Sequence, residues 1–156
     1  MAFINEPIPA QLISAKLNLE WDDKSGNVPK PKIIEANSVE ESRFLETPLN
    51  INPQYKNIII VRSDATGEQE RLRDLGAKYK DVTFDVVIDL HSSHSKQMMY
   101  NIKAEVRRII HKNMHNFSGY DVCYYRSFTD FAQQNINYWS GMIRCQFISN
   151  KVYLDT

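Results

Sequence analysis

Alternating apolar and polar residues near the middle of the chain predict the strand on which the fold is built. Between Asp81 and His91 nearly every second residue is apolar, and Asp85 and Asp89 are among the polar residues between them. A period of two places the apolar side chains on one face of a β-strand and the polar ones on the other. The apolar face comprises Val82, Phe84, Val86, Ile88 and Leu90.

The next apolar pattern has helical spacing and predicts a long helix over about residues 95–113. The polar segment HSSHS precedes it, and Ser92, Ser93 or Ser95 is a suitable N-cap. Apolar residues then recur every three or four positions, which makes a stripe along one side of a helix. We expect this stripe to pack on the apolar strand face, since neither can hide its apolar surface alone. The stripe comprises Met98, Met99, Ile102, Val106, Ile109 and Ile110.

The remaining patterns predict one shorter helix and several strands. Gln11–Trp21 has helical spacing, and the β-branched run in KNIIIVRS predicts a strand that is buried on both faces. Residues 128–137 are expected to be irregular. The other predicted strands are Lys32–Ala36, GYDVCYYRS from Gly119, and YWSGMIRCQFIS from Tyr138.

Three segments lie outside these elements. Residues 1–10 are predicted to form an extended arm, and residues 37–55 favour no element clearly. Residues 64–80 are highly charged and are predicted to form a long exposed hairpin connection, with a short helix at Glu68–Leu75 as the alternative. Connections longer than about 12–15 residues are usually functional or disordered, so residues 64–80 are a candidate contact loop.

Together these patterns predict an α+β fold. We expect residues 1–156 to form a single domain, given their number. The predicted sheet is mostly antiparallel with four or five strands. The 95–113 helix packs on one of its faces, and a shorter N-terminal helix accompanies it.

Composition narrows the classes of function. Nineteen basic and nineteen acidic residues cancel, so bulk charge does not indicate nucleic acid or an anionic membrane as a partner. No apolar run approaches the roughly 20 residues of a membrane span, and the N-terminus lacks the pattern of a secretory signal. Cys123 and Cys145 are expected to be free buried thiols, as in a reducing compartment.

Two groups of residues are weak candidates for binding a metal ion. Asp89, His91 and His94 have side chains that suit zinc or iron, but a solvated strand end with a polar cap is the better explanation of them. His111 and His115 are four residues apart, but a helix C-terminus favours histidine through its dipole alone. We therefore predict no metal ion and no cofactor.

A metal-dependent nuclease centre is the enzymatic alternative. Asp85, Asp89 and Glu105 could hold a divalent ion beside a phosphate, with Lys103 nearby. Acids that alternate along a strand are also what a face toward water or a partner would show. The chain has no glycine-rich phosphate loop and no Gly-x-Ser-x-Gly elbow, so we predict no enzymatic activity.

Charged residues in the 64–80 segment, on the strand and on the helix are candidates for contacts between subunits. A sheet with a partly polar and aromatic second face, flanked by charged loops, suits a subunit that buries surface against its own copies. The candidates are Glu68, Glu70, Arg71, Arg73, Asp74, Asp85, Asp89, Arg107 and Arg108.

The order of elements resembles the tail terminator and neck proteins of tailed bacteriophages and tailed archaeal viruses. The likeness spans roughly residues 10–150 and rests on packing patterns. Its best match is FDVVIDLHSS followed by a helix containing EVRRII; IIIVRS, GYDVCYYRSFTDF and NYWSGMIRCQFI also correspond. Residues 37–55 depart from the compact form of the family.

The resemblance implies a structural virion protein that forms a homo-oligomeric ring, usually of six subunits. Such a ring ends the tail tube and joins it to the connector of the head, so the implied partners are the tail tube protein and the neck proteins. Genome DNA would pass through the lumen without specific binding, with Asp85 and Asp89 as candidate lining residues. The implied location is the virion, and the host cytoplasm during assembly. A tail-tube or head-completion subunit is the alternative within the virion, and a binding module without a viral role is a further one.

Overall fold

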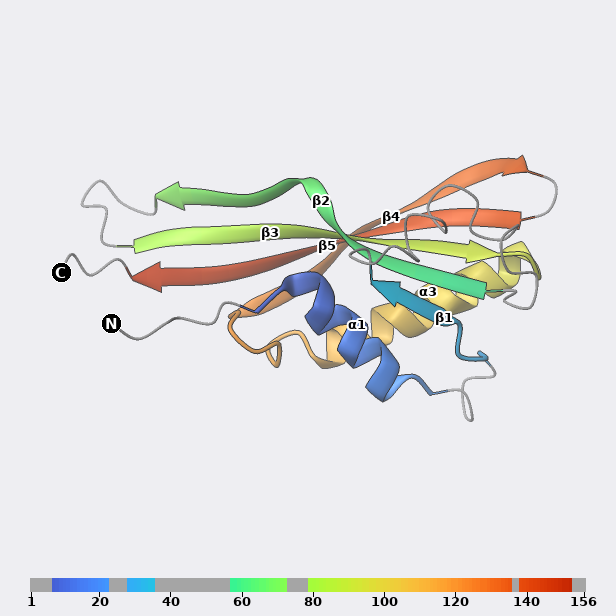
Figure 1. The fold of residues 1–156 in the computed structure, drawn as a ribbon, viewed down its shortest axis with the longest axis horizontal. Helices are drawn as coiled ribbons and strands as arrows, with labels where there is room; N and C mark the ends of the chain where they lie inside the picture. Colours follow the sequence, from blue (N-terminus) through green and yellow to red (C-terminus); the bar gives the residue numbers. More distant parts are fainter. Residues whose placement is uncertain (1–6, 23–27, 36–56, 73–78, 136–137, 153–156) are drawn as a thin grey trace.

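A computed structural model describes residues 7–22, 28–35, 57–72, 79–135 and 138–152, with side chains described for most of them. The fold is α+β, as the sequence predicts: one five-stranded sheet carries two helices (Figure 1). The segment 37–55 lies outside the described residues.

The sheet is mixed, with its parallel pair at one edge. The strand order is β1-β2-β3-β5-β4; β1 runs parallel to β2, and the other three pairs are antiparallel. The prediction of a mostly antiparallel sheet is therefore confirmed. The elements are α1 (Pro9–Glu20), β1 (Lys32–Glu35), β2 (Asn57–Leu72), β3 (Tyr79–Ser92), α3 (Lys96–Lys112), β4 (Val122–Asn135) and β5 (Tyr138–Val152).

Both helices lie on the same face of the sheet and share one hydrophobic core with it (Figure 1). Ile102 and Val106 of α3 belong to the same buried cluster as Val86 and Ile88 of β3, which confirms the predicted packing of strand on helix. A fully buried aliphatic side chain contributes roughly 1.5–3 kcal/mol. This layer is therefore the main source of the stability of the fold.

The ends of α3 are set by local hydrogen bonds. Ser95 is the N-cap: its Oγ accepts a hydrogen bond from the Met98 amide at 3.0 Å. At the other end, the Asn113 amide donates to the carbonyl oxygen of Ile109 at 3.1 Å. The predicted bounds of about 95–113 are confirmed.

The predicted N-terminal arm is shorter than expected, because α1 already begins at Pro9. Proline suits the first helical position, where its missing N–H has no intrahelical partner. Pro7 is also held, since its carbonyl oxygen accepts a hydrogen bond from the Tyr120 hydroxyl at 2.8 Å. Its ring lies over Gly119 (φ +87°), where an added Cβ would come within 2.8 Å of it. Residues 1–6 of the predicted arm lie outside the described residues.

The predicted connection at 64–80 is wrong for most of its length, because strand continues on both sides. β2 runs on to Leu72, and its residues Glu68–Leu72 pair with Lys80–Phe84 of β3. The alternative helix is wrong for residues 68–72 as well. A register shift between Ser63 and Glu68 absorbs extra residues and hides the continuation from a simple alternation pattern. Residues 73–78 lie outside the described residues.

The segment 128–137, predicted to be irregular, is also strand as far as Asn135. In the pairing with β5, Tyr125 lies opposite Cys145 and Ser127 opposite Arg144, so one residue of β4 is extra there. Such a bulge shifts the alternation of faces by one residue. The alternation of apolar and polar residues is therefore interrupted in this segment, although the strand continues.

The second face of the sheet is covered in part by the chain itself. The register places Ile58 and Ile60 on the side away from the helices, opposite His91 and Asp89, and both isoleucines are fully buried. Val87 shares that face and is 1% exposed. The strand KNIIIVRS is thus buried on both sides, as predicted. Around Ile58, Ile60 and Val87 this second face is therefore not open to neighbouring subunits.

Candidate functional site

The three residues of the first metal candidate have other partners. Asp89 is 9% exposed and accepts a 2.7 Å hydrogen bond from Nε of Arg62. Nδ1 of His91 lies 2.9 Å from Oγ of Ser140. Burial lowers the pKa of His91 below its ordinary value of 6.5, and the charge of Asp89 opposes this shift in part. His94 lies in the turn before α3 and is exposed. The described residues include no group of three potential metal ligands.

The residues of the nuclease candidate lie on opposite sides of the sheet. Asp85 and Asp89 are on the face away from the helices, where Asp85 accepts a hydrogen bond from Gln146 at 3.2 Å. Glu105 is buried on α3, on the helix side. Lys103 also lies on α3, with its ammonium over the ring of Tyr100 at 4.5 Å. A divalent ion cannot bridge groups separated by a sheet, so this constellation is not assembled.

The second histidine pair also lies apart from any ligand set. His111 is on the exposed side of α3 and packs edge-on against the ring of Tyr125, at 6.1 Å between centroids. Nδ1 of His115 lies 3.3 Å from the carbonyl oxygen of Asp121. Both side chains thus contact neighbouring elements of the fold.

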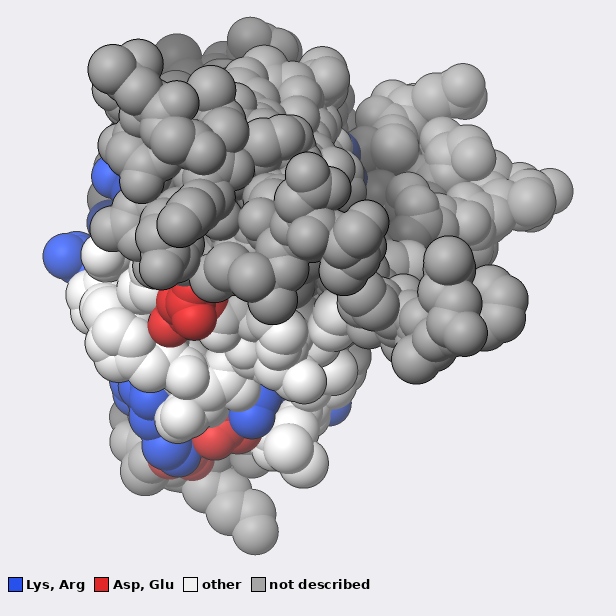
Figure 2. Space-filling view, turned by 90° about the vertical axis from the view of Figure 1, so that its left-hand side faces the viewer, with Lys and Arg blue, Asp and Glu red and all other residues white. Residues whose placement is uncertain are grey.

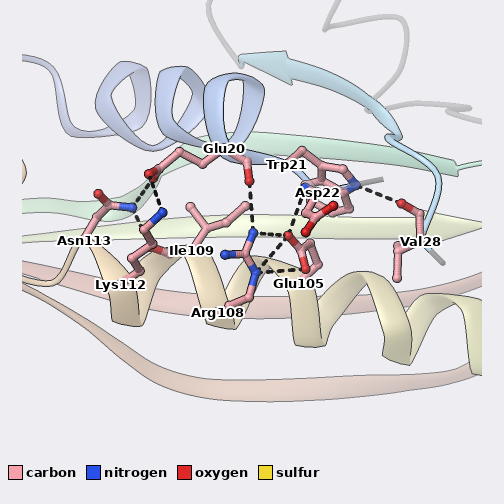
Figure 3. Close-up of polar contacts among 9 residues, drawn as sticks. All are labelled: Glu20, Trp21, Asp22, Val28, Glu105, Arg108, Ile109, Lys112 and Asn113. Carbon is pink, nitrogen blue, oxygen red and sulfur yellow. Dashed lines mark hydrogen bonds and ion pairs between the residues drawn. The ribbon is translucent and has the colours of Figure 1, made fainter. Parts of the chain in front are cut away.

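Arg108 and Glu105 join the two helices (Figure 3). Glu105 is 7% exposed and accepts from Nε of Arg108 at 3.0 Å and from the Asp22 amide at 3.2 Å. Nη2 of Arg108 also donates to the carbonyl oxygen of Glu20, the last residue of α1. The hydrogen bonds to Glu105 raise the pKa of Arg108. Beside them, Lys112 and Asn113 both contact the carboxylate of Glu20. Arg108 therefore holds α1 on α3.

A second group of side chains joins α3 to β4. Tyr100 donates to Asp130 at 2.8 Å, and Lys96 pairs with the same carboxylate oxygen at 3.2 Å. The hydrogen bond from Tyr100 lowers the pKa of Asp130. The Lys103 ammonium lies over the rings of both Tyr100 and Phe128. Arg107, one turn further along, stacks over Tyr125 at 5.1 Å. A shallow hollow of about 480 Å³ follows this exposed side of α3.

The open part of the second sheet face lies over β4 and β5. Tyr124 is 44% exposed and Phe131 is 38% exposed, and the register places both on this face. A hollow of about 220 Å³ lies there between Asp85, Arg126 and Arg144. Among the described residues, this exposed surface thus carries aromatic and mainly basic side chains.

The most distinctive feature is a three-stranded extension of the sheet, formed by Glu68–Leu72 of β2, Tyr79–Phe84 of β3 and Phe147–Val152 of β5. These segments project beyond both helices, to the left in Figure 1. Figure 2 views the molecule from that end, and its described surface carries both basic and acidic side chains.

The extension contains part of the predicted contact set. Glu68, Glu70 and Arg71 belong to its β2 strand, whereas Arg73 and Asp74 lie outside the described residues. Sequence reasoning singled out this stretch of the chain as a candidate contact region but missed that it is sheet. The signal for a sheet here was the β-forming residues Val82 and Phe84 of β3, the strand that pairs with Glu68–Leu72.

Comparisons with known proteins give no family for this chain. No family model matches it, and no curated protein sequence matches it significantly. Neither helix in the described part of the chain is long and apolar enough to cross a membrane.

Proposed function

We propose that this protein is a structural subunit of a virion that assembles into a ring at the neck or tail end. In that place it ends the tail tube and joins it to the head through the neck proteins. The resemblance of its packing patterns to tail terminator and neck proteins suggests the role, and the α+β fold is compatible with it.

The observation that carries the proposal is the three-stranded extension. Val82 and Ser149 of the extension are buried, so what it offers to another chain is its backbone edges. No described strand pairs with the outer edge of β2 beyond Val61 or of β5 beyond Ile148. Proteins normally cover or pair such edges, and assembly with further copies does so. Among the described residues no alternative reactive centre competes, because the acids of the nuclease candidate are separated by the sheet.

The test uses the full chain and tail tubes from a virus that carries this gene. Tubes without their terminal cap are incubated with gold-labelled protein and viewed by electron microscopy, while mass photometry measures the protein alone. We expect a closed ring in solution or on the tube, and label at one end of each tube.

Three results would overturn the proposal. The first is a protein that stays monomeric and never labels a tube end. The second is label spread along the tube wall, which would indicate a tube subunit. The third is metal-stimulated cleavage of DNA that Asp89→Ala abolishes, which would indicate an enzyme. Asp121→Ala, an exposed acid outside the nuclease candidate, is the matched control for that measurement.

A further inference from the structure

The extension has two sheet edges that no described strand covers. β1 pairs with β2 only from Ile58 to Val61, so on that side no described strand lies beside Arg62–Leu72. β4 pairs with β5 as far as Ile148, so no described strand lies beside Ser149–Val152 on the other side. Along both edges no described strand pairs with the outward N–H and C=O groups, and a strand edge of this kind is the template for adding a strand.

Within the extension, from Glu68 to Leu72 of β2 and from Ser149 to Val152 of β5, these two edges are regular, whereas the outer strand β4 is not. The register between β2 and β3 runs without a shift from Glu68 to Leu72, and that between β3 and β5 runs without a shift to Val152. β4 instead has register shifts at Tyr125/Ser127 and Phe131/Asn135. Bulges blunt an edge against pairing with another chain. The two edges of the extension are therefore the better sites for strand addition.

We propose that β2 of one copy pairs in parallel with β5 of the next copy, so that the extensions form one continuous sheet around the ring. This inference rests on the proposed ring and names the contact that closes it. The seam joins Glu68–Leu72 of one copy to Ser149–Val152 of its neighbour.

Strand direction and symmetry support this pairing. β2 and β5 are each antiparallel to β3, so they run in the same direction within one copy. Rotation about an axis roughly along the strands preserves that direction, so β2 meets the next β5 in parallel. Head-to-tail contacts of this kind generate a ring when the rotation between copies closes. The arrangement uses both edges of every copy, whereas a two-fold pairing of β2 with β2 would leave the β5 edges open.

The same symmetry and the backbone register predict which residues share a face of the sheet across the seam. Glu70, Val82 and Ser149 lie in one row across the extension, and Leu72, Lys80 and Lys151 lie in another. Rotation keeps the inner face inside, so these rows continue with the same facing into the next copy. Glu70 and Leu72 of one copy therefore share a face with Ser149 and Lys151 of its neighbour.

Disulfide cross-linking tests the seam. Four double variants combine Glu70→Cys or Leu72→Cys with Ser149→Cys or Lys151→Cys, which covers the registers that the facing allows. Within one chain β3 separates β2 from β5 by two strand spacings, roughly 9.5 Å. A disulfide requires Cα atoms within about 7 Å. Every bridge that forms is therefore between copies.

On oxidation of the assembled protein, we expect at least one of the four variants to give a ladder on a non-reducing gel that ends at the subunit number of the ring. The matched control, Arg71→Cys with Ser149→Cys, places its thiols on opposite faces and should not cross-link. The single variants report any contribution from the native cysteines, which are buried.

Hydrogen exchange on the unmodified protein gives a second readout that does not depend on the variants folding. Amides in 68–72 and 149–152 should exchange roughly tenfold or more slowly after assembly, because paired amides exchange only through local opening. An intact ring without a ladder, or with unchanged exchange in these segments, overturns the seam and leaves the proposed function standing. Failure to form any ring, alone or on tail tubes, overturns both.

Discussion

Removing the Arg108 guanidinium should destabilise the fold because it leaves a buried carboxylate without its main partner. Glu105 is 7% exposed, and among the described residues its carboxylate in Arg108→Met would keep the 3.2 Å hydrogen bond from the Asp22 amide alone. Breaking one side of a fully buried ion pair costs about 3–5 kcal/mol. The Arg108 side chain is 43% exposed, so water can reach part of the site. We therefore expect a loss of about 2 kcal/mol.

The measurement is urea unfolding of the unassembled protein, followed by circular dichroism. With a slope of about 1–3 kcal/mol/M, a loss of that size lowers the midpoint by roughly 1 M. Replacing both partners, in Glu105→Met/Arg108→Met, should recover at least half of the loss, because a buried pair exchanged for apolar side chains is often nearly neutral.

The matched control is Lys112→Met, which removes an ion pair with Glu20 from the neighbouring turn of the same helix. The Lys112 side chain is 60% exposed, so the change should cost less than about 0.5 kcal/mol. The reasoning would be refuted if Arg108→Met were as mild as this control, or if the double variant were less stable than Arg108→Met.

Three further outcomes follow from other parts of the structure. Gly141→Ala should lower the free energy of unfolding, measured in urea, by about 1–2 kcal/mol, because its Cβ would lie 2.7 Å from the aromatic ring of Phe128. Combining it with Phe128→Leu should reduce this loss, and an unchanged loss would show that the Phe128 side chain is not the obstacle. Because the pKa of His91 is lowered in the folded protein, the unfolded state binds a proton at this imidazole more readily, and the free energy of unfolding should fall as the pH drops below about 6.5. His91→Gln should make the free energy of unfolding less dependent on pH in this range, and an equal slope in both proteins would contradict the role given to His91. Cys123 and Cys145 are buried, and their contact together with burial raises the pKa of Cys145 well above its ordinary value. A thiol reagent should therefore label neither cysteine in the native protein and both in urea, whereas rapid labelling of the native protein would contradict their burial.

The central layer could be predicted from sequence because its signals are local and agree with each other. The alternation around Val86 and the helical spacing around Ile102 each define one apolar face within a short stretch. Two such faces in adjacent elements can bury themselves only against each other. The sequence offered Ser92, Ser93 and Ser95 as caps for the helix, and the structure shows that Ser95 is the one used.

What sequence reasoning missed depends on pairing between distant segments. The charged residues 68–72 form strand because β3 lies beside them, and β4 continues past its bulge because β5 does the same for it. Glu105 is buried because its carboxylate meets the Asp22 amide, 83 residues earlier in the chain. Helical spacing alone marks that position as a surface acid. The separation of Asp89 from Glu105 likewise follows from topology, which no spacing in the sequence encodes.

The uninterrupted pairing of β3 with β5 has a mechanical consequence. These two strands stay in one register from Tyr79/Val152 to Ser92/Trp139, and so run from the free tip of the sheet into the layer beneath the helices. β2 has its irregularity between Ser63 and Glu68, where the tip leaves the body of the molecule. A twisting force applied to the extension would thus be transmitted into the core through the continuous hydrogen bonding of β3 and β5, whereas β2 would bend at its register shift between Ser63 and Glu68.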